Sequence, residues 1–218
     1  YVPWAMPWTS QFAKLPRGRE GATDGKGNSE IPAIFACHPH GVLPVTWGIS
    51  FAAFCPQDPY ILTADILYRF PIVRELGLWF GCLNASHRSI ENALNQGRSV
   101  VVLPGGVREM GLSNEHGPTV VVKRKGFIRA ALKSGATIVP VFGFGIDKVY
   151  TQFVVRSEVL RNLFGCYPFV PVGRFDMYTP KHVSCHHVCG EPIQVSKKPD
   201  FTPQDVDEIY SKFYSELE

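Results

Sequence analysis

A stretch of 27 residues without a charged side chain constrains the fold of this chain more than any other feature. From Ile31 to Gln57 there is no Asp, Glu, Lys or Arg, and the length would suit a membrane-spanning helix, which needs about 20 apolar residues. Two histidines, Gly41 and the prolines Pro39 and Pro44 interrupt the stretch, however, and an irregular backbone in lipid leaves polar groups unsatisfied. We therefore expect a buried strand over 32–37, an irregular segment, and a helix over 42–54.

Apolar strands alternate with amphipathic helices along the rest of the chain. With 218 residues, 45% of them hydrophobic, the sequence is long enough for one well-buried domain, and no linker divides it. The alternation predicts an α/β fold, a single domain with a largely parallel sheet flanked by helices. Further strands are expected over 60–64, 99–103, 137–142 and 183–189, and helices over 71–80, 90–95 and 125–134 and after the N-cap Thr202.

Charge and cysteine usage exclude several classes of protein. The formal net charge is only +3 and no run of five basic residues occurs, which argues against a nucleic-acid partner. Six cysteines are spread through a chain too long to need a disulfide framework, and none forms a CxxC pair. A reducing, cytosol-facing setting fits this pattern better than secretion.

Two histidines on either side of a proline follow the first predicted strand. A buried imidazole at this place must find a hydrogen-bond partner, so His38 and His40 indicate a function. If a helix opens at Val42, the partial positive charge of its N-terminus keeps His40 neutral at pH 7, as a general base requires. Gly41 has no Cβ and would let a substrate approach closely. The alternative is that both histidines only hydrogen-bond a turn.

The segment 104–109, with the sequence PGGVRE, directly follows the predicted strand SVVVL. It is therefore expected at the same carboxyl edge of the sheet as the histidines, if the two strands are parallel. Gly105 and Gly106 would offer backbone N–H groups to an anion or oxyanion. Glu109 is the best carboxylate to accept the other ring N–H of His40 and fix its tautomer. The alternative is a Gly-Gly turn with a solvated glutamate.

Basic residues recur at helical spacing in the segment 123–133. Lys125, Arg129 and Lys133 fall at i, i+4 and i+8, where like charges repel by a few tenths of a kcal/mol. A polyanion would compensate them, and coenzyme A with its three phosphate groups is such a ligand. We assign Arg124, Lys125 and Arg129 to acyl-CoA binding, with a solvated basic face as the alternative.

These motifs, in this order, resemble the type-2 diacylglycerol acyltransferase family, which includes monoacylglycerol and wax-ester relatives. The resemblance runs from about residue 33 to 195 and also rests on the block RKGFIRAALKSGATIVPVFGFG over 124–145 and on VCGEPI over 188–193. It implies a glycerolipid acyltransferase-like fold and an integral or monotopic enzyme of the endoplasmic reticulum and lipid droplets. It also implies that His40 is the catalytic residue, with Glu109 as its partner.

The resemblance implies acyl transfer from acyl-CoA to a lipid hydroxyl, with diacylglycerol as the first expectation and monoacylglycerol or a fatty alcohol as alternatives. His38 completes the expected catalytic set, and the partners are acyl-CoA, a neutral lipid acceptor and a membrane surface. No cofactor or metal is expected besides acyl-CoA as co-substrate. The alternatives from other functional classes are an acyl-CoA thioesterase and a non-catalytic lipid-binding module.

The sequence departs from related patterns at three places. The His-x4-Asp motif of other glycerolipid acyltransferases is absent, because Leu43 and Val45 stand where its aspartate would be. The orienting role therefore falls to Glu109. The pair Ile146-Asp147 stands where the family usually has Glu-Asn, and Arg108 intrudes in the PGG turn.

Two other kinds of site deserve comparison with the acyltransferase reading. A zinc site could join the two histidines to Cys185, His186, His187 and Cys189, but these residues lack the ligand spacing of known zinc motifs. The segment 48–52 (GISFA) loosely resembles the nucleophile elbow of a serine hydrolase, but it lies inside a predicted helix.

Aromatic residues near the start of the chain indicate a membrane surface. Trp and Tyr favour the interface between headgroups and acyl chains, and a second cluster, Leu78-Trp79-Phe80, follows later. We expect residues 1–31 to form a membrane-proximal segment and residues 32–218 the acyltransferase domain, with firm anchoring from a segment upstream of Tyr1. The alternative is that the early aromatics are core residues. The early cluster comprises Tyr1, Trp4, Met6, Trp8 and Phe12.

Overall fold

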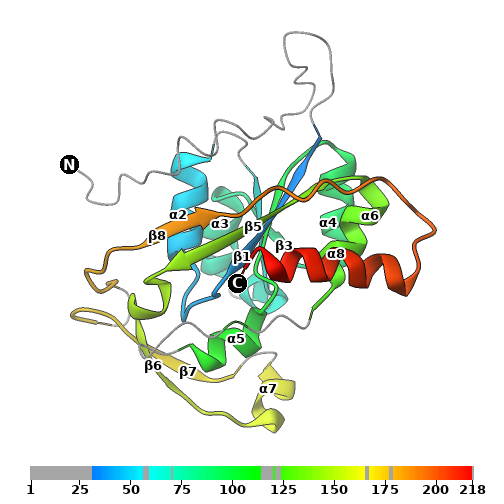
Figure 1. Cartoon of the computed structure of the whole chain (residues 1–218). Coiled ribbons are helices and arrows are strands. Elements are labelled where there is room, and N and C mark those ends of the chain that lie inside the picture. Colours follow the sequence, from blue (N-terminus) through cyan, green and yellow to red (C-terminus); the bar gives the residue numbers. More distant parts are fainter. Residues whose placement is uncertain are drawn as a thin grey trace.

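A six-stranded sheet in the order β3-β2-β4-β1-β5-β8 forms the centre of the protein (Figure 1). The computed structural model describes residues 31–55, 59–69, 71–113, 120, 124–164, 167–176 and 179–217. The strands of this sheet are β1 (Ala33–His38), β2 (Tyr60–Thr63), β3 (Cys82–Asn84), β4 (Val100–Val102), β5 (Thr137–Phe144) and β8 (His186–Cys189). The helices are α2 (Val45–Phe54), α3 (Pro71–Trp79), α4 (His87–Asn95), α5 (Gly106–Leu112), α6 (Gly126–Ser134), α7 (Glu158–Phe164) and α8 (Pro203–Ser215), with 3₁₀ turns η1 (Asp65–Arg69) and η2 (Ile146–Lys148).

All neighbouring strands of this sheet are parallel except β8, which runs antiparallel to β5. Strand β1 lies between β4 and β5, with Ala36 opposite both Val102 and Pro140. The carboxyl ends of these three strands therefore meet at one edge, which is where ligands gather in open α/β sheets. The predicted fold, a single α/β domain with a largely parallel sheet, is confirmed.

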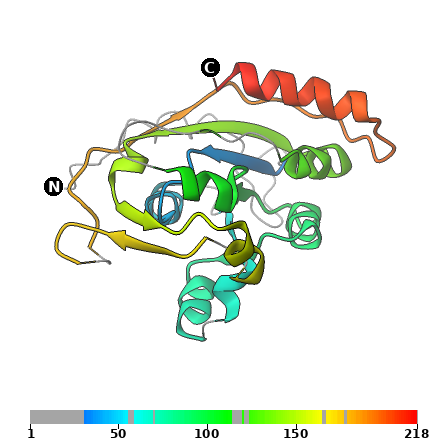
Figure 2. The same cartoon turned by 90° about the horizontal axis from the view of Figure 1, so that it is seen from below.

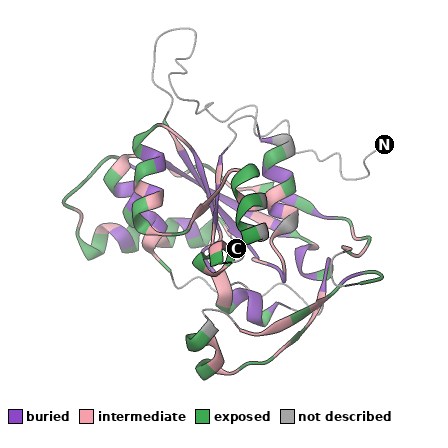
Figure 3. Ribbon diagram, turned by 180° about the vertical axis from the view of Figure 1, so that it is seen from behind, coloured by how far each residue is buried: buried purple, intermediate pink, exposed green. Residues whose placement is uncertain are grey.

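The central strands β4 and β1 and most of β5 are buried on both faces, as a parallel sheet requires (Figure 3). Alternate residues of β1 point to opposite cores, with Ile34 and Ala36 in one and Phe35 and Cys37 in the other. The first core lies under α4, α6 and α8, and the second lies under α2. His38 is the last residue of β1, so the same alternation decides which face of the sheet its side chain meets.

Local sequence signals account for most of the helices. Thr202 and Asp205 form a capping box at the start of α8, and Gly135 ends α6 in the left-handed conformation with a φ of 80°. Helix α2 begins at Val45 and not at Val42, because Pro44 sits in the turn before it. No helix of the described residues is both long and apolar enough to cross a bilayer.

Five helices and strands were not predicted from the sequence. Strand β3 is only three residues long, and α5 begins at two glycines that resemble a turn. A separate two-stranded antiparallel sheet, β6 (Thr151–Val154) with β7 (Phe169–Val172), and the helix α7 between its strands were also missed. This part lies beyond α5 and apart from the central sheet (Figure 2).

Candidate active site

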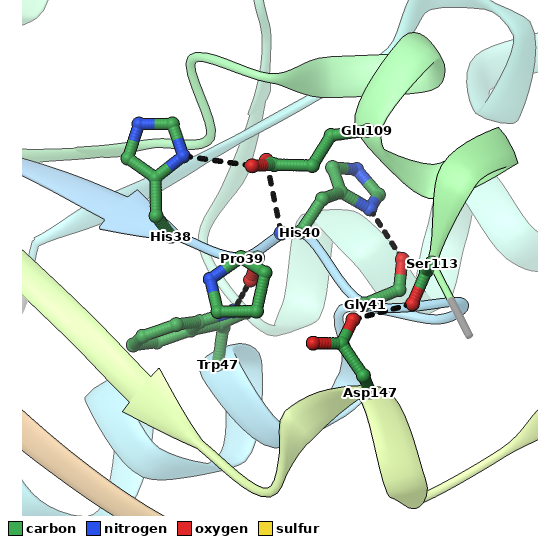
Figure 4. Close-up of polar contacts among 8 residues, drawn as sticks. All are labelled: His38, Pro39, His40, Gly41, Trp47, Glu109, Ser113 and Asp147. Carbon is green, nitrogen blue, oxygen red and sulfur yellow. Dashed lines mark hydrogen bonds and ion pairs between the residues drawn. The ribbon is translucent and has the colours of Figure 1, made fainter. Parts of the chain in front are cut away.

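The HPHG segment leaves the sheet at the carboxyl end of β1 and carries the first two candidate residues (Figure 4). His38 is the last residue of β1 and is fully buried on the same face as Ile34 and Ala36, where its ring lies 6.1 Å from that of Phe213. His40 lies beyond the strand and is half-buried. The two rings therefore occupy different environments, although only one residue separates them.

Glu109 on α5 connects the two histidines. Its Oε1 accepts a hydrogen bond from Nδ1 of His38 at 2.9 Å, and its Oε2 accepts one from the backbone N–H of His40 at 3.0 Å. The sequence predicted that Glu109 would hold the ring of His40. The carboxylate instead orients the ring of His38 and the backbone of His40, because α5 meets the segment on the face of β1 to which His38 points.

The His40 ring is oriented by its own loop. Its Nδ1 lies 2.9 Å from the carbonyl oxygen of Gly41, and a carbonyl can only accept a hydrogen bond. The proton of the neutral ring is therefore on Nδ1, which leaves the lone pair on Nε2. The tautomer that a general base needs is thus fixed by a backbone carbonyl and not by a carboxylate.

Burial lowers the pKa of His40 below its ordinary value, and the positive charge of Arg124 lowers it further, while the Gly41 carbonyl and Glu109 oppose the shift. The sequence predicted a neutral ring from the N-terminus of the following helix. Helix α2 begins only at Val45, so the main cause is loss of solvent and not the helix dipole.

The two glycines at the start of α5, the N-cap Gly105 and the first helical residue Gly106, serve packing more than anion binding. A Cβ on Gly105 would lie 1.9 Å from Oε2 of Glu109, so a side chain here would displace the carboxylate. The N–H of Gly106 donates to the carbonyl oxygen of Leu103 at 3.0 Å. Because that group is already used in the turn, Gly106 is the less suitable of the two glycines that the sequence proposed as oxyanion donors.

The basic residues that the sequence assigned to acyl-CoA binding or to the same helical stripe have different contacts in the structure. Arg124 packs on Gly106 and acts on His40 electrostatically. Lys125 instead pairs with Asp207 of α8 and lies 4.5 Å from the ring centre of Tyr210. Lys133 pairs with Glu91 at 2.7 Å, whereas Arg129 is exposed. Carboxylates of the protein thus compensate two of the like charges that the sequence assigned to a polyanion.

Two residues that sequence reasoning did not select fix parts of the site: Trp47 holds the HPHG segment, and Ser113 joins the end of α5 to η2. Trp47 on α2 is fully buried and donates a hydrogen bond from Nε1 to the carbonyl oxygen of Pro39 at 3.0 Å. Ser113, just after α5, donates to Oδ1 of Asp147 at 2.5 Å, and both side chains are buried. Asp147 had been noted only as a departure from a family pattern. An aromatic donor eight residues after a proline gives no signal in the sequence.

The competing sites find little support in the part of the chain that the structure describes. No three His, Cys, Asp or Glu side chains among the described residues are placed to hold a metal ion. His187 packs edge-on against Trp47 with 4.5 Å between ring centres, and burial lowers its pKa to about 4. Ser50 is buried within α2 and not on a strand-to-helix turn, which excludes the nucleophile-elbow reading.

Of the two aromatic clusters expected at a membrane surface, only the second lies within the described residues. The early aromatic cluster, from Tyr1 to Phe12, is outside them. The second cluster is exposed, with Leu78, Trp79 and Phe80 all facing solvent at the end of α3.

Comparisons with known proteins agree with the motifs. The family profile described as "Diacylglycerol acyltransferase" matches residues 27–218. Diacylglycerol O-acyltransferase 2 of Dictyostelium discoideum is 32% identical over 209 residues, which cover 84% of this chain and 62% of that protein. Acyl-CoA wax alcohol acyltransferase 1 of Mus musculus is 29% identical over 211 residues, which cover 84% and 63%. Diacylglycerol O-acyltransferase 2 of Homo sapiens is 29% identical over 210 residues, which cover 84% and 54%.

The chain therefore spans between about half and three fifths of the length of these relatives. Among solved structures, the 1-acyl-sn-glycerophosphate acyltransferase of Thermotoga maritima matches with a TM-score of 0.51 and 16% identity, covering 90% of this chain and 70% of that chain. At this identity the match concerns the fold alone, and it agrees with a single α/β domain.

Proposed function

This chain belongs to the diacylglycerol acyltransferase family, and we propose that it transfers a fatty acyl group from coenzyme A to the hydroxyl of a neutral lipid, with His40 as general base. The observation that carries the proposal is the state of the His40 ring. Its Nδ1–H is held by the Gly41 carbonyl, its pKa is lowered by burial, and it stands at the carboxyl edge of the sheet. A neutral imidazole with its lone pair on Nε2 suits proton removal at pH 7.

In the proposed reaction, Nε2 of His40 accepts the proton of the acceptor hydroxyl while that oxygen attacks the thioester carbonyl carbon. A new C–O bond forms, and the tetrahedral intermediate collapses as the C–S bond breaks. The coenzyme A thiolate leaves and can take the proton from the imidazolium, which restores the neutral base. No other co-reactant is needed for this balance.

His38 and Glu109 act in this proposal as positioning residues. Glu109 fixes the backbone of His40 through Oε2, and its other oxygen is held by the buried ring of His38. Trp47 fixes the intervening carbonyl of Pro39. Three hydrogen bonds, two from Glu109 on α5 and one from Trp47 on α2, thus hold a segment of three residues, which is the rigidity that a positioned base requires.

Negative charge that develops on the thioester oxygen needs donors close to His40. We assign this role to the backbone N–H of Gly105 and the guanidinium of Arg124, since Gly106 is engaged with Leu103. Arg124 packs on this turn and is exposed, so it can also meet a phosphate of coenzyme A. Arg129 is exposed and extends the proposed acyl-CoA surface, whereas Lys125 belongs to it only if its pair with Asp207 opens.

Diacylglycerol is the acceptor that we favour, with triacylglycerol as product. Relatives of this chain include proteins named for diacylglycerol and for wax alcohols, so monoacylglycerol and fatty alcohols are the alternatives to test. Both substrates carry long acyl chains, which places the reaction at a membrane surface. We propose the cytosolic face of the endoplasmic reticulum and the lipid droplet, in keeping with the exposed cluster Leu78-Trp79-Phe80.

One assay tests the function directly. Purified protein in detergent micelles receives labelled acyl-CoA and, separately, diacylglycerol, monoacylglycerol or a fatty alcohol, and the ester formed is identified. The proposal predicts an ester with at least one acceptor and most product with diacylglycerol. Release of free fatty acid as the sole product would identify a thioesterase, and binding without turnover would identify a carrier.

A further inference from the structure

The ribbon formed by β6 and β7 has one face toward the protein and one face away from it. Phe153 lies opposite Val170, and Thr151 lies opposite Val172. Directly opposed residues of an antiparallel pair share a face, so these four side chains lie on one side of the ribbon. Those of the intervening residues Gln152, Val154, Phe169 and Pro171 lie on the other side.

The inner face of the ribbon is attached to α5. The side-chain amide of Gln152 donates to the carbonyl oxygens of Met110 at 2.6 Å and Ser113 at 2.8 Å. Phe169 packs against the core that contains Trp47. Arg156, just beyond β6, donates from Nε to the carbonyl oxygen of Gly111 at 3.2 Å. The ribbon is thus joined to the helix that carries Glu109.

The outer face is apolar and exposed. Phe153 is 72% exposed, and Val170 and Val172 beside it are exposed as well. Helix α7 adds Val159 and Leu163, four residues apart on one stripe and both exposed. Phe175, which follows β7, is 80% exposed. All of these exposed apolar side chains belong to residues 153–175, and exposed apolar groups of this number often mark a surface that meets a partner.

Positive charge accompanies these apolar residues. Between residues 148 and 181 the sequence has five basic and two acidic residues, an excess as large as the net charge of the whole chain. Lys148, Arg156 and Arg174 are exposed, and the guanidinium of Arg174 lies 4.8 Å from the ring centre of Phe175. Aromatic and aliphatic side chains with basic residues among them suit a surface of anionic headgroups over acyl chains.

We propose that the outer face of the β6–β7 ribbon, together with α7, is the surface by which this protein docks on an anionic phospholipid bilayer. We call it the lipid-docking face; it comprises Phe153, Val155, Val159, Leu163, Val170, Val172 and Phe175 with the basic residues Lys148 and Arg174. A second copy of the chain is a poorer occupant, because two such faces would bring their positive charges together.

Docking by this face would hold α5 and the HPHG segment close to the headgroups, since the inner side of the same ribbon is bonded to α5. This consequence rests on the proposed function, because it matters only if the protein acts on a lipid acceptor in the bilayer. Binding to the bilayer does not itself require turnover, so the two can fail separately.

Vesicle flotation of the full chain tests the lipid-docking face. The vesicles are phosphatidylcholine, either alone or with roughly a quarter of phosphatidylserine. The apolar variant combines Phe153→Gln with Val159→Gln, and its matched control combines Ile49→Gln with Val188→Gln, two apolar residues exposed on α2 and β8. The basic variant combines Lys148→Gln with Arg174→Gln.

The wild type should float with the anionic vesicles, and each apolar residue lost from the face should lower its partition coefficient about tenfold. Each basic residue lost should lower it about fivefold, and added salt should reduce that difference. The control variant should float like the wild type. All variants should keep the wild-type melting temperature and the wild-type turnover in detergent micelles. If the apolar variant melts at a lower temperature, the flotation of the basic variant and of the single variant Leu163→Gln tests the proposal in its place.

Wild-type flotation of both the apolar and the basic variant would overturn the proposal. So would conversion of a dimer to a monomer by the apolar variant with no change in flotation, because the face would then join two copies of the chain. Normal flotation of a wild type that forms no ester in micelles would instead refute the proposed function and leave the lipid-docking face standing.

Discussion

Glu109 accepts a hydrogen bond from Nδ1 of His38 at 2.9 Å, and both side chains are fully removed from solvent. A buried pair of this kind is costly to break from one side, because the remaining polar group is left without a partner. Nε2 of His38 already has no hydrogen-bond partner among the described residues. The contact with His38 therefore helps to fix the position of Glu109, and with it the backbone of His40, to which the other carboxylate oxygen is bonded.

The change Glu109→Gln should separate catalysis from binding. The amide keeps one acceptor oxygen but loses the charge, so only one of the contacts to His38 and His40 can be retained at full strength. We expect kcat to fall by roughly tenfold to a hundredfold with little change in the acyl-CoA KM. Steady-state kinetics with varied acyl-CoA measure both quantities. A rise in KM at constant kcat would assign Glu109 to substrate binding.

Gly105→Ala should disturb the site through Glu109. The backbone at Gly105 has a φ of −65°, which alanine adopts easily, but the added Cβ would lie 1.9 Å from Oε2. Overpacking of this kind costs about 1–3 kcal/mol, so both the melting temperature and kcat should fall. The control is Gly48→Ala in α2, where the nearest atom is 3.9 Å away and stability should rise slightly. Equal behaviour of the two variants would show that Gly105 does not position Glu109.

Charge reversal should distinguish Arg124 from Lys125. Arg124→Glu should raise the KM for acyl-CoA and weaken its salt dependence, since the guanidinium lies beside the Gly106 turn. Arg129→Glu should act in the same direction. Lys125→Glu should instead lower stability by up to about 1 kcal/mol, and the partner change Asp207→Lys should restore it. An unchanged KM and salt profile in all three reversals would leave these residues as a solvated basic face.

The pH dependence should report the burial of His40. The base acts when neutral, and because burial lowers its pKa, the ring stays neutral below the ordinary value of 6.5. We expect kcat/KM to be flat near pH 7 and to fall only as the pH drops through a midpoint below 6.5. Glu109 raises the pKa of His40, so Glu109→Gln should move that midpoint lower still. A midpoint above 6.5 in the wild type would mean that the titrating base is not a buried imidazole.

The sequence predicted which elements meet at the site but not how they touch. HPHG and PGGVRE were expected at one sheet edge because each follows an apolar strand, and β1 and β4 are indeed parallel neighbours. Which histidine ring Glu109 contacts depends instead on the alternation of side chains between the two faces of β1. Ile34, Ala36 and His38 alternate onto the face covered by α6 and α8, and a single sequence does not reveal which face α5 will meet.

Other features were hidden by weak local patterns. Helix α5 begins at two glycines, whose low helix propensity favours the prediction of a turn. The burial of Glu109, which accompanies the helix, is visible only in the structure. The hydrogen bond from Trp47 to Pro39 joins two elements through a side chain that any apolar helix could carry. The β6–β7 ribbon was missed because four-residue strands separated by a helix lack a hairpin signal.

The most direct measurement for the whole account is turnover by His40→Ala with labelled acyl-CoA and diacylglycerol in micelles. A positioned general base contributes roughly 10²- to 10⁴-fold in rate, so ester formation should fall by at least about a hundredfold while the melting temperature stays within a few degrees. His182→Ala, which removes an exposed histidine, is the control and should keep wild-type turnover. Retention of more than about a tenth of wild-type activity by a folded His40→Ala protein would contradict the assignment of His40 as the base.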